Sequence, residues 1–355
     1  MAVWQFVVAT AAGSPLAELP ATSMQVQWHL DDPAEASCTV DGLTAEASEV
    51  QELLTDLLVY RDSVLKFRGR IVEADDSVGD SHDLSIRATD YRGLLARRFT
   101  YAGTGWGATD QAQIAWNLIA YAQGLTGVSW GIIRGSGQTT GILRDRLYVA
   151  GANVGELLDN LGRVINGYDW EVDANLALNI FYPTRGTSKD FVAEYGNTVT
   201  SFQRSVSSDG YANAVRATGA DTLTPVTATA ADLASRPEGR WDLQIGDTDI
   251  TQQATLTEKA NGALARGEVL LPSYTCTVDP DRWTPDSAWV GDSTQLVLRS
   301  GRLDVAAVER IESVSVSIND AGAETVALTY GKRRRELEVF LLRFFGARLT
   351  NLERR

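Results

Sequence analysis

A three-strand pattern occurs twice in this chain and constrains its fold more than any other feature. The first copy comprises Leu58–Arg61, Arg70–Glu73 and Leu84–Ala88. The second comprises Leu296–Arg299, Arg310–Ser313 and Val326–Tyr330. The first residues of corresponding strands lie 238, 240 and 242 residues apart in the two copies. Small loop insertions between strands that keep their inner and outer faces would give such distances. The pattern predicts one β unit used twice, although two unrelated strand trios could also share ordinary β residues.

The length and the charge limit the classes of function. A chain of 355 residues is too long for one compact core, so two to four domains are expected. The net charge of −14 argues against a nucleic-acid-binding surface, because phosphate binding needs clustered positive charge. An acidic wall past which DNA moves without sticking remains compatible with this charge.

The charges are unevenly distributed along the chain. Nine acidic residues and no Lys or Arg precede Arg61, whereas Lys332–Arg355 carries eight basic residues against three acidic ones. Such complementary ends favour head-to-tail contacts between subunits, but a solvated basic tail without a partner is an equal alternative.

The segment from Glu336 to Phe345 is apolar on nearly every side. A helix of this kind must be buried, either in its own subunit or in a neighbour. We therefore predict a subunit contact element near the end of the chain. Its candidate residues are Lys332, Arg333, Arg334, Arg335, Leu337, Phe340, Leu341, Phe344 and Phe345.

The pattern of hydrophobic residues predicts a mainly β fold with an α+β insert. Two related, small β-barrel-like domains are expected, together with helix-containing insertions. The predicted parts are a first β domain at 1–98, an α+β insert at 99–195, a second β domain split between 196–225 and 290–331, a helix-containing insert at 226–289 and a C-terminal helical segment at 332–355.

Helix signals lie within the two inserts. Thr109 is a candidate cap for a helix that ends near Gln123, and Asn153 with Glu156 forms a capping box for a second helix. A hairpin is expected to follow, with its turn at Ala174-Asn175. Thr251–Arg266 is predicted to be a further helix with an unfavourable internal glycine.

Few residues have the spacing of a catalytic or metal site. The only histidines are His29 and His82, 53 positions apart, which nearly excludes both a His-based triad and a multi-histidine metal site. Cys38 and Cys276 are the only cysteines, and we predict that both are small buried hydrophobes. No stretch of 18 or more apolar residues occurs, so no membrane-spanning segment is expected. We predict no cofactor.

Two groups of carboxylates have a spacing that a site could use. Asp169, Glu171 and Asp173 alternate on one face of a predicted strand, as a glycoside hydrolase would allow, but a solvent-facing strand edge shows the same alternation. The loop containing Asp279, Asp281 and Asp286 resembles half of a calcium loop. It lacks the glycine and the distal glutamate of such a loop, so a turn is the better interpretation.

Nine tryptophans keep a carbohydrate-binding module as an alternative, since exposed indole rings can serve as sugar platforms. Tryptophan is used more often as a core or interface anchor. The tryptophans are Trp4, Trp28, Trp106, Trp116, Trp130, Trp170, Trp241, Trp283 and Trp289.

The order of these segments resembles the tail hub, or baseplate hub, proteins of long-tailed siphovirus-type phages. The resemblance covers most of the chain but consists of loose patterns. It is carried by Val59–Asp62, Phe67–Val72, Leu84–Leu95, Gly167–Asp173, Tyr211–Gly219, Val290–Asp292 and the closing copy of the repeat.

The resemblance implies a structural protein without enzymatic activity. It implies a homotrimer with quasi-six-fold symmetry that caps the distal tail tube of the virion after assembly in the host cytoplasm. The implied partners are the distal tail protein ring, the tape-measure protein, and tail fibre or receptor-binding proteins, with DNA only in transit through the pore. No long extension follows the second β unit, so we expect no receptor-binding or wall-degrading domain there. The alternatives are a tail-associated wall hydrolase and a carbohydrate-binding module.

Overall fold

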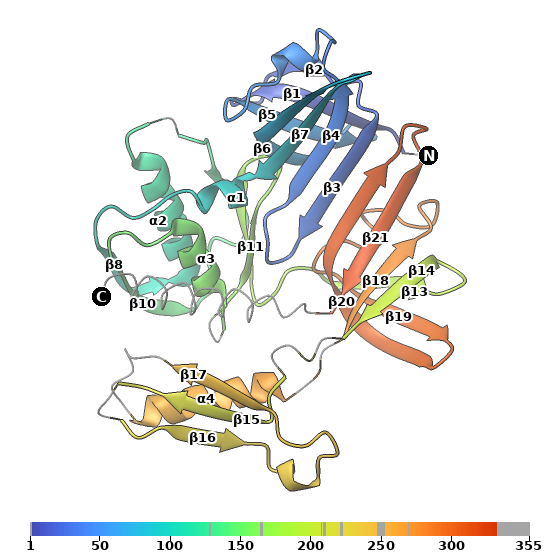
Figure 1. The fold of residues 1–355 in the computed structure, drawn as a ribbon. Coiled ribbons are helices and arrows are strands. Elements are labelled where there is room, and N and C mark those ends of the chain that lie inside the picture. The colour runs from blue at the N-terminus through green and yellow to red at the C-terminus, as the bar shows by residue number, and fades with distance from the viewer. Residues whose placement is uncertain are drawn as a thin grey trace. The chain divides into compact units, whose positions relative to one another are not determined.

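The computed structural model describes residues 2–331 except 128, 164–165, 207, 209–210, 221–222, 247–252, 269 and 271. Met1–Phe202 and Thr275–Tyr330 form one compact unit, called here the main unit, and a second, small unit includes Gln203–Tyr274. Strands dominate the main unit, whereas the small unit combines a short sheet with one helix (Figure 1). The predicted mainly β fold with helix-containing insertions is therefore confirmed.

The first β unit contains seven strands, and apolar side chains alternate with polar ones in several of them. In β3, for example, Val26 and Trp28 are buried while Gln25 is exposed, as expected for a sheet with one covered face. The strands are β1 (Trp4–Thr10), β2 (Pro15–Glu18), β3 (Ser23–His29), β4 (Glu35–Asp41), β5 (Thr55–Arg61), β6 (Val64–Val78) and β7 (His82–Asp90). A 3₁₀ turn (Ala47–Glu49) precedes β5, and α1 (Tyr91–Leu95) follows β7.

The second β unit has six strands in the same spatial order as six of the first. Neighbouring strands run β3-β4-β7-β6-β5-β1 in the first unit and β14-β18-β21-β20-β19-β13 in the second. The two units differ in the direction of one strand pair, because β1 is antiparallel to β5 whereas β13 is parallel to β19. The strands are β13 (Ser188–Glu194), β14 (Val199–Ser205), β18 (Ser273–Val278), β19 (Ser293–Ser300), β20 (Leu303–Ile318) and β21 (Glu324–Tyr330).

The register of the repeat is the same in both units, down to an irregularity in the long central strand. Ile71 of β6 lies opposite Ala88, and after a register shift Glu73 lies opposite Arg87. Ile311 of β20 lies opposite Tyr330, and after a register shift Ser313 lies opposite Thr329. The predicted separations of 240 and 242 residues are thus confirmed, because each residue in these pairs has its counterpart at that distance.

The third predicted separation was wrong by one residue. Val59 lies opposite Phe67 in the first unit, and Leu296 lies opposite Ala307, the counterpart of Phe67, in the second. The separation between β5 and β19 is therefore 237 residues instead of 238. A one-residue slip exchanges inner and outer faces, and consecutive apolar residues in β5 conceal that slip in the sequence.

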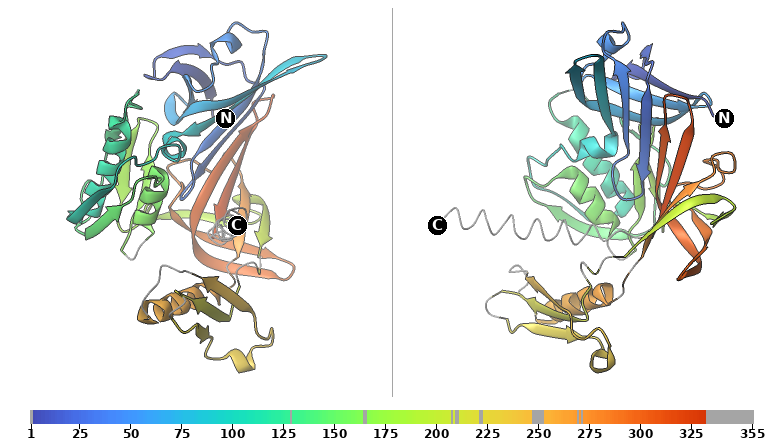
Figure 2. Two further views of the ribbon diagram at one scale, coloured as in Figure 1. Left: turned by 60° about the vertical axis from the view of Figure 1, so that its left-hand side comes forward. Right: turned by 45° about the vertical axis from the view of Figure 1, so that its right-hand side comes forward.

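The two β units are joined edge to edge into one 13-stranded sheet. The connection is the antiparallel pair of β3 with the second half of β20, in which Val26 lies opposite Val316 and Met24 opposite Ile318. Strands from opposite ends of the chain thus lie side by side, as the blue and red ribbons show in Figures 1 and 2. Among the described residues, no strand pair closes either unit into a barrel of its own.

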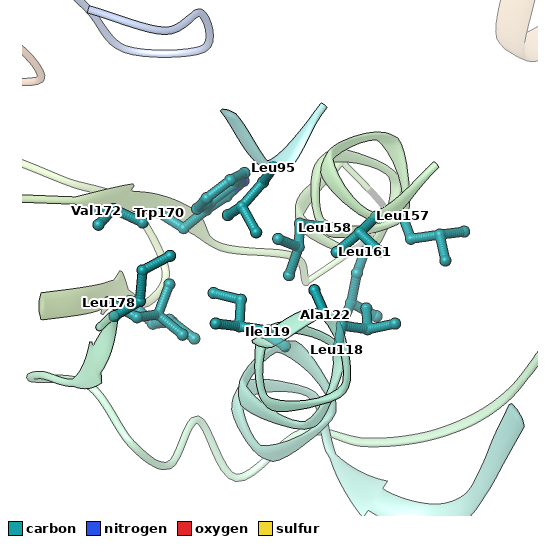
Figure 3. Close-up of a cluster of buried hydrophobic side chains, with 14 of the residues drawn as sticks. Leu95, Leu118, Ile119, Ala122, Leu157, Leu158, Leu161, Trp170, Val172 and Leu178 are labelled. Carbon is teal, nitrogen blue, oxygen red and sulfur yellow. The ribbon is translucent and has the colours of Figure 1, made fainter. Parts of the chain in front are cut away.

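The α+β insert packs around its own hydrophobic core. Its strands are β8 (Thr104–Asp110), β9 (Ile133–Arg134), β10 (Leu143–Tyr148), β11 (Asp169–Val172) and β12 (Ala177–Phe181). Its helices are α2 (Gln111–Gly124) and α3 (Val154–Gly162). Figure 3 shows Leu118 and Ile119 of α2 meeting Leu158 and Leu161 of α3 and Trp170 of β11, all of them buried.

The cap of the first helix in this insert differs from the prediction, whereas the second is as expected. Asp110 caps α2, with its carboxylate accepting a hydrogen bond from the Ala112 amide at 2.8 Å, so the helix starts beyond Thr109. Asn153 caps α3 by accepting from the Glu156 amide at 3.1 Å. The predicted hairpin is also present as the antiparallel pair of β11 and β12.

The small unit consists of a three-stranded sheet and one helix. β15 (Ala214–Thr218) lies between β16 (Val226–Thr229) and β17 (Asp242–Gly246), and α4 (Gln253–Gly267) packs on the sheet through Leu256 and Ala260. A 3₁₀ turn (Leu233–Ser235) connects β16 to β17. These strand memberships divide the region differently from the predicted segments 196–225 and 226–289, since β15 belongs to the small sheet and β18 to the large one. Alternation identifies a strand but not the sheet it joins.

None of the described helices is long and apolar enough to cross a membrane.

Candidate subunit interface

The predicted contact element at the end of the chain, from Lys332 to Phe345, lies outside the described residues. Its role in subunit contacts stays a prediction. The described residues offer a different candidate, which is the set of strand edges left by the duplicated β unit.

The three alternating carboxylates of β11 and the turn after it all serve structural contacts. Asp169 forms an ion pair with Arg310 and accepts a hydrogen bond from the Arg185 amide at 2.7 Å. Glu171 pairs with Arg185 at 2.7 Å, and burial raises the pKa of Glu171 above its usual value. Asp173 accepts hydrogen bonds from two amides in the hairpin turn, at 2.9 Å each. The acids therefore position the insert against the second β unit.

Arg92 joins the insert to the first β unit. Its guanidinium donates to the Leu30 and Asp31 carbonyls at 2.9 and 2.8 Å, and forms an ion pair with Asp159 of α3 at 2.8 Å. The same group lies 4.4 Å from the centre of the Trp170 ring. A buried arginine whose donors are satisfied in this way fixes the geometry of the contact between the insert and the first β unit.

A polar cleft of about 420 Å³ lies beside this contact. Its walls include Arg92, Glu171 and Arg185, whose charges are already paired with one another or with neighbours. Asp90, also in the wall, accepts the Ala34 and Gly93 amides at 2.9 Å each, and burial raises its pKa to about 6. Its position as the cap of α1 explains this carboxylate without a catalytic role.

The remaining predicted polar residues form local contacts. The Asp279 side chain accepts the Asp281 amide at 3.0 Å, and the Asp286 carbonyl accepts from Lys189 Nζ at 3.1 Å. His82 begins β7, and its Nε2 lies 2.8 Å from a carboxylate oxygen of Asp76. Among the residues that the structure describes, no group of three or more His, Cys, Asp or Glu side chains could hold a metal ion.

The tryptophans are mostly covered. Trp28, Trp283 and Trp289 form one cluster, with ring centres 4.8 Å apart for Trp28 and Trp289 and 6.1 Å apart for Trp283 and Trp289. Only Trp241, in the small unit, is more than a third exposed, and it packs edge-on against Tyr211. The arrangement favours core anchoring over a row of sugar platforms.

The junction between β3 and β20 is the best-defined edge-to-edge contact in the main unit. Six residue pairs run from Ser313 opposite His29 to Ile318 opposite Met24. Val26 and Val316 are fully buried, and Ile318 is 4% exposed. Every residue of β20 in this stretch is uncharged. It is an apolar seam between two equivalent units.

The corresponding edges at the two ends of the large sheet are free among the described residues. β6 is the counterpart of β20, but the part of β6 beyond Ile71 pairs on one side only, with β7. β14 is the counterpart of β3 and pairs only with β18 in this sheet. Val78, the counterpart of Ile318, is 76% exposed.

Two short sequence matches could have revealed these counterparts, but our reading of the sequence missed them. Ser37-Cys38-Thr39-Val40-Asp41 in β4 matches Thr275-Cys276-Thr277-Val278-Asp279 at and just after β18. Thr22-Ser23-Met24-Gln25 matches Thr200-Ser201-Phe202-Gln203. Both cysteines are buried, as predicted, and burial raises the pKa of each thiol to about 12.

No protein-family model matches the sequence, and no curated protein matches it significantly. Solved structures of phage tail proteins share its fold. The 43 kDa tail protein of prophage MuSo2 from Shewanella oneidensis superposes with a TM-score of 0.67 at 13% identity, covering 92% of this chain and 97% of that one. A tail protein from Neisseria meningitidis gives 0.61 at 11% identity over 93% and 96% of the two chains.

A third similar structure, prophage tail protein gp18 from Listeria monocytogenes, has a TM-score of 0.58 at 12% identity and covers 96% of this chain and 98% of that one. The match in fold extends over nearly the whole length of all three proteins. It confirms the fold that the family resemblance implied.

Proposed function

We propose that this protein is a structural hub at the distal end of a long-tailed, siphovirus-type phage tail, and that three copies form a ring with quasi-six-fold symmetry. The observation that carries the proposal is the β3–β20 junction, which joins two units of equal strand order and register within one chain.

The geometry of this junction allows it to repeat between copies of the chain. It is heterologous, because one unit contributes the strand equivalent to β6 and the other contributes the strand equivalent to β14. A heterologous contact leaves one complementary edge free at each end, so it repeats until a ring closes or a filament grows. Two units per chain and six per ring require three chains. The number six comes from the family resemblance, and the equivalence of the units comes from the strand register.

The proposed partners follow from this position in the virion. The ring would bind the distal tail protein ring on one face, tail fibre or receptor-binding proteins on the other, and the tape-measure protein within. The tail tip would assemble in the host cytoplasm. A net charge of −14 would allow DNA to pass through the pore without adsorbing to its wall.

A structural role also accounts for the acidic residues better than catalysis does. Asp169 and Glu171 hold arginines that connect the insert to the second β unit. The similar solved structures carry the names of tail proteins. We therefore propose that the protein has no enzymatic activity of its own.

The ring is tested by measuring the mass of the purified full chain with multi-angle light scattering and imaging the same sample by electron microscopy. We expect three copies per particle and class averages with a three-fold ring of six similar lobes. A monomer at every concentration tested, or a two-fold dimer, would contradict the proposed homotrimer.

We also propose that the segment from Lys332 to Phe345 contributes to the subunit contacts. Replacing both Phe340 and Phe344 by Asp should abolish the trimer and leave a soluble, folded monomer. A trimer of unchanged stability in this variant would remove the segment from the interface without affecting the proposed ring.

A further inference from the structure

The duplicated unit allows the internal junction to be transferred, residue by residue, to the free edges. Residues of β6 correspond to β20 at a distance of 240, as the shared register shift at Ile71 and Ile311 establishes. The second correspondence comes from a shared hydrogen bond. Thr22 Oγ1 donates to the Thr39 carbonyl at 3.3 Å, and Thr200 Oγ1 donates to the Thr277 carbonyl at 3.2 Å.

This bond aligns β3 with β14 at a distance of 178 residues, from Thr22 to Thr200. The alignment places Ser23-Met24-Gln25 on Ser201-Phe202-Gln203, which agrees with the matched sequence. The acceptors agree as well, because Thr39 and Thr277 occupy the same place in the two copies of the Cys-Thr-Val motif. Two independent features therefore define the counterpart of each junction residue.

We infer that the far half of β6 in one copy pairs antiparallel with β14 of a second copy of this chain, in the register of the internal junction. This inference rests on the proposed ring. Transferring the three observed pairs Ile318–Met24, Ser317–Gln25 and Val316–Val26 gives the expected contacts. They are Val78 opposite Phe202, Ser77 opposite Gln203 and Asp76 opposite Arg204.

The side chains on these edges fit each other. Residues directly opposite in an antiparallel pair lie on the same face, so Asp76 would meet Arg204 and the exposed Val78 would meet the ring of Phe202. Asp76 is 62% exposed, and His82 is its described partner, which leaves one carboxylate oxygen accessible. The charge pair takes the place that two buried valines occupy inside the chain.

The charges also oppose incorrect pairings. Two β6 edges brought together would place Asp75 and Asp76 near the same acids of the second copy, and like charges opposite one another are destabilising. The far half of β6 next to an uncharged edge such as that of β20 would leave its acids unpaired. An acidic β6 edge and a basic β14 edge therefore favour only the head-to-tail contact that a ring requires. The junction between β3 and β20 needs no such charges to select its partner, because its strands belong to one chain.

The register is tested by disulfide trapping in the full chain. The variant Ser77→Cys/Gln203→Cys, oxidised under native conditions, should yield a covalent trimer on a denaturing, non-reducing gel. An equimolar mixture of the two single variants should stop at covalent dimers. The pair Ser77→Cys/Ser201→Cys, two residues out of register on the same face, is the matched control and should cross-link at least about tenfold more slowly, because its Cβ atoms would lie too far apart.

The internal junction offers a positive control for geometry. Gln25→Cys/Ser317→Cys is the equivalent pair within one chain, and it should oxidise without any increase in mass. Light scattering of the reduced samples shows whether the ring forms, and cross-linking shows whether β6 and β14 meet in it. A trimer in which Ser77→Cys and Gln203→Cys do not cross-link, or cross-link no faster than the control, would overturn this junction and leave the ring standing. A monomer without cross-links would overturn both.

A charge exchange tests the paired groups. Asp76→Arg and Arg204→Asp should each weaken trimer formation by about tenfold or more, since each places like charges opposite one another. The variant with both substitutions should recover most of the trimer formation that each single variant loses. The contact should also weaken as the salt concentration is raised. If both single variants assemble like the original chain, or if the double variant assembles no better than the singles, the assigned register is wrong.

Discussion

The first and second β units have the same strand order and the same register around β6 and β20, yet their outer edges differ. In the second unit, β20 ends in Val314, Val316 and Ile318, all buried against β3. In the first, the counterpart residues of β6 are Ala74, Asp76 and Val78, of which the last two are exposed. The difference teaches that a common backbone can carry a buried apolar junction at one edge and an exposed, charged edge at the other.

The largest expected difference lies between two counterpart positions. Ile318→Asp should lower the free energy of unfolding by about 3 kcal/mol or more, because it removes a buried side chain and buries a charge. Val78→Asp should change it by no more than about 0.5 kcal/mol, because that side chain is 76% exposed. Urea unfolding of dilute, unassembled protein measures both. Equal losses would mean that the two edges do not differ in burial.

A second contrast concerns buried carboxylates. Asp56 is fully buried and accepts hydrogen bonds from Arg68 Nε at 2.9 Å, Arg70 Nε at 2.7 Å and the Tyr91 hydroxyl at 2.8 Å. Asp56→Ala should therefore cost about 3–5 kcal/mol, since it leaves two arginines unpaired.

The nearest equivalent in the second unit is Asp292, one residue before the position that corresponds to Asp56. It accepts two backbone amides, from Thr187 at 2.9 Å and Trp289 at 3.0 Å, and lies 3.9 Å from Lys189. Asp292→Ala should cost about 1–3 kcal/mol, the usual range for unsatisfied amides. Denaturant unfolding compares the two variants. A greater loss for Asp292→Ala would show that the second unit, not the first, depends more on its buried acid.

Shortening a core side chain next to the register shift should destabilise the protein equally in both units. Ile71 and Ile311 are counterparts and are both fully buried. Ile71→Val and Ile311→Val each remove one methylene group and should each cost about 0.5–1.5 kcal/mol. Parallel thermal and urea unfolding would check this, with the exposed Val308→Ala as a control. A difference of more than about 1 kcal/mol between the two variants would limit the equivalence of the units to their backbone.

The smallest expected effect concerns the labelling rates of the two native cysteines, which can be compared without any mutation. Burial raises the pKa of Cys38 and Cys276 to about 12, so neither thiol should form a reactive thiolate in the folded protein at neutral pH. Labelling should follow local opening of β4 and β18. We expect mass spectrometry of digested peptides to give rates within about tenfold of each other. Rapid labelling of one cysteine alone would show that its unit opens independently.

Local signals predicted much of the architecture. The Asn153 cap, the β11–β12 hairpin and the repeated strand trio depend on neighbouring residues or on side-chain alternation, which the sequence states directly. The β5–β19 offset failed because consecutive apolar residues leave the inner face of β5 undefined. The start of α2 was misplaced because Thr109 and Asp110 are both good caps, and only the hydrogen bond to Ala112 distinguishes them.

The sequence by itself determined that a β unit is duplicated and that charge is separated along the chain. Alternation and residue type encode these properties locally. Only the tertiary structure decided that β3 pairs with β20 and that β15 leaves the large sheet for a small one. The free edges of β6 and β14 also became visible only there. Strand pairing depends on which edges meet across hundreds of residues, and an edge looks the same in the sequence whether it is paired or free.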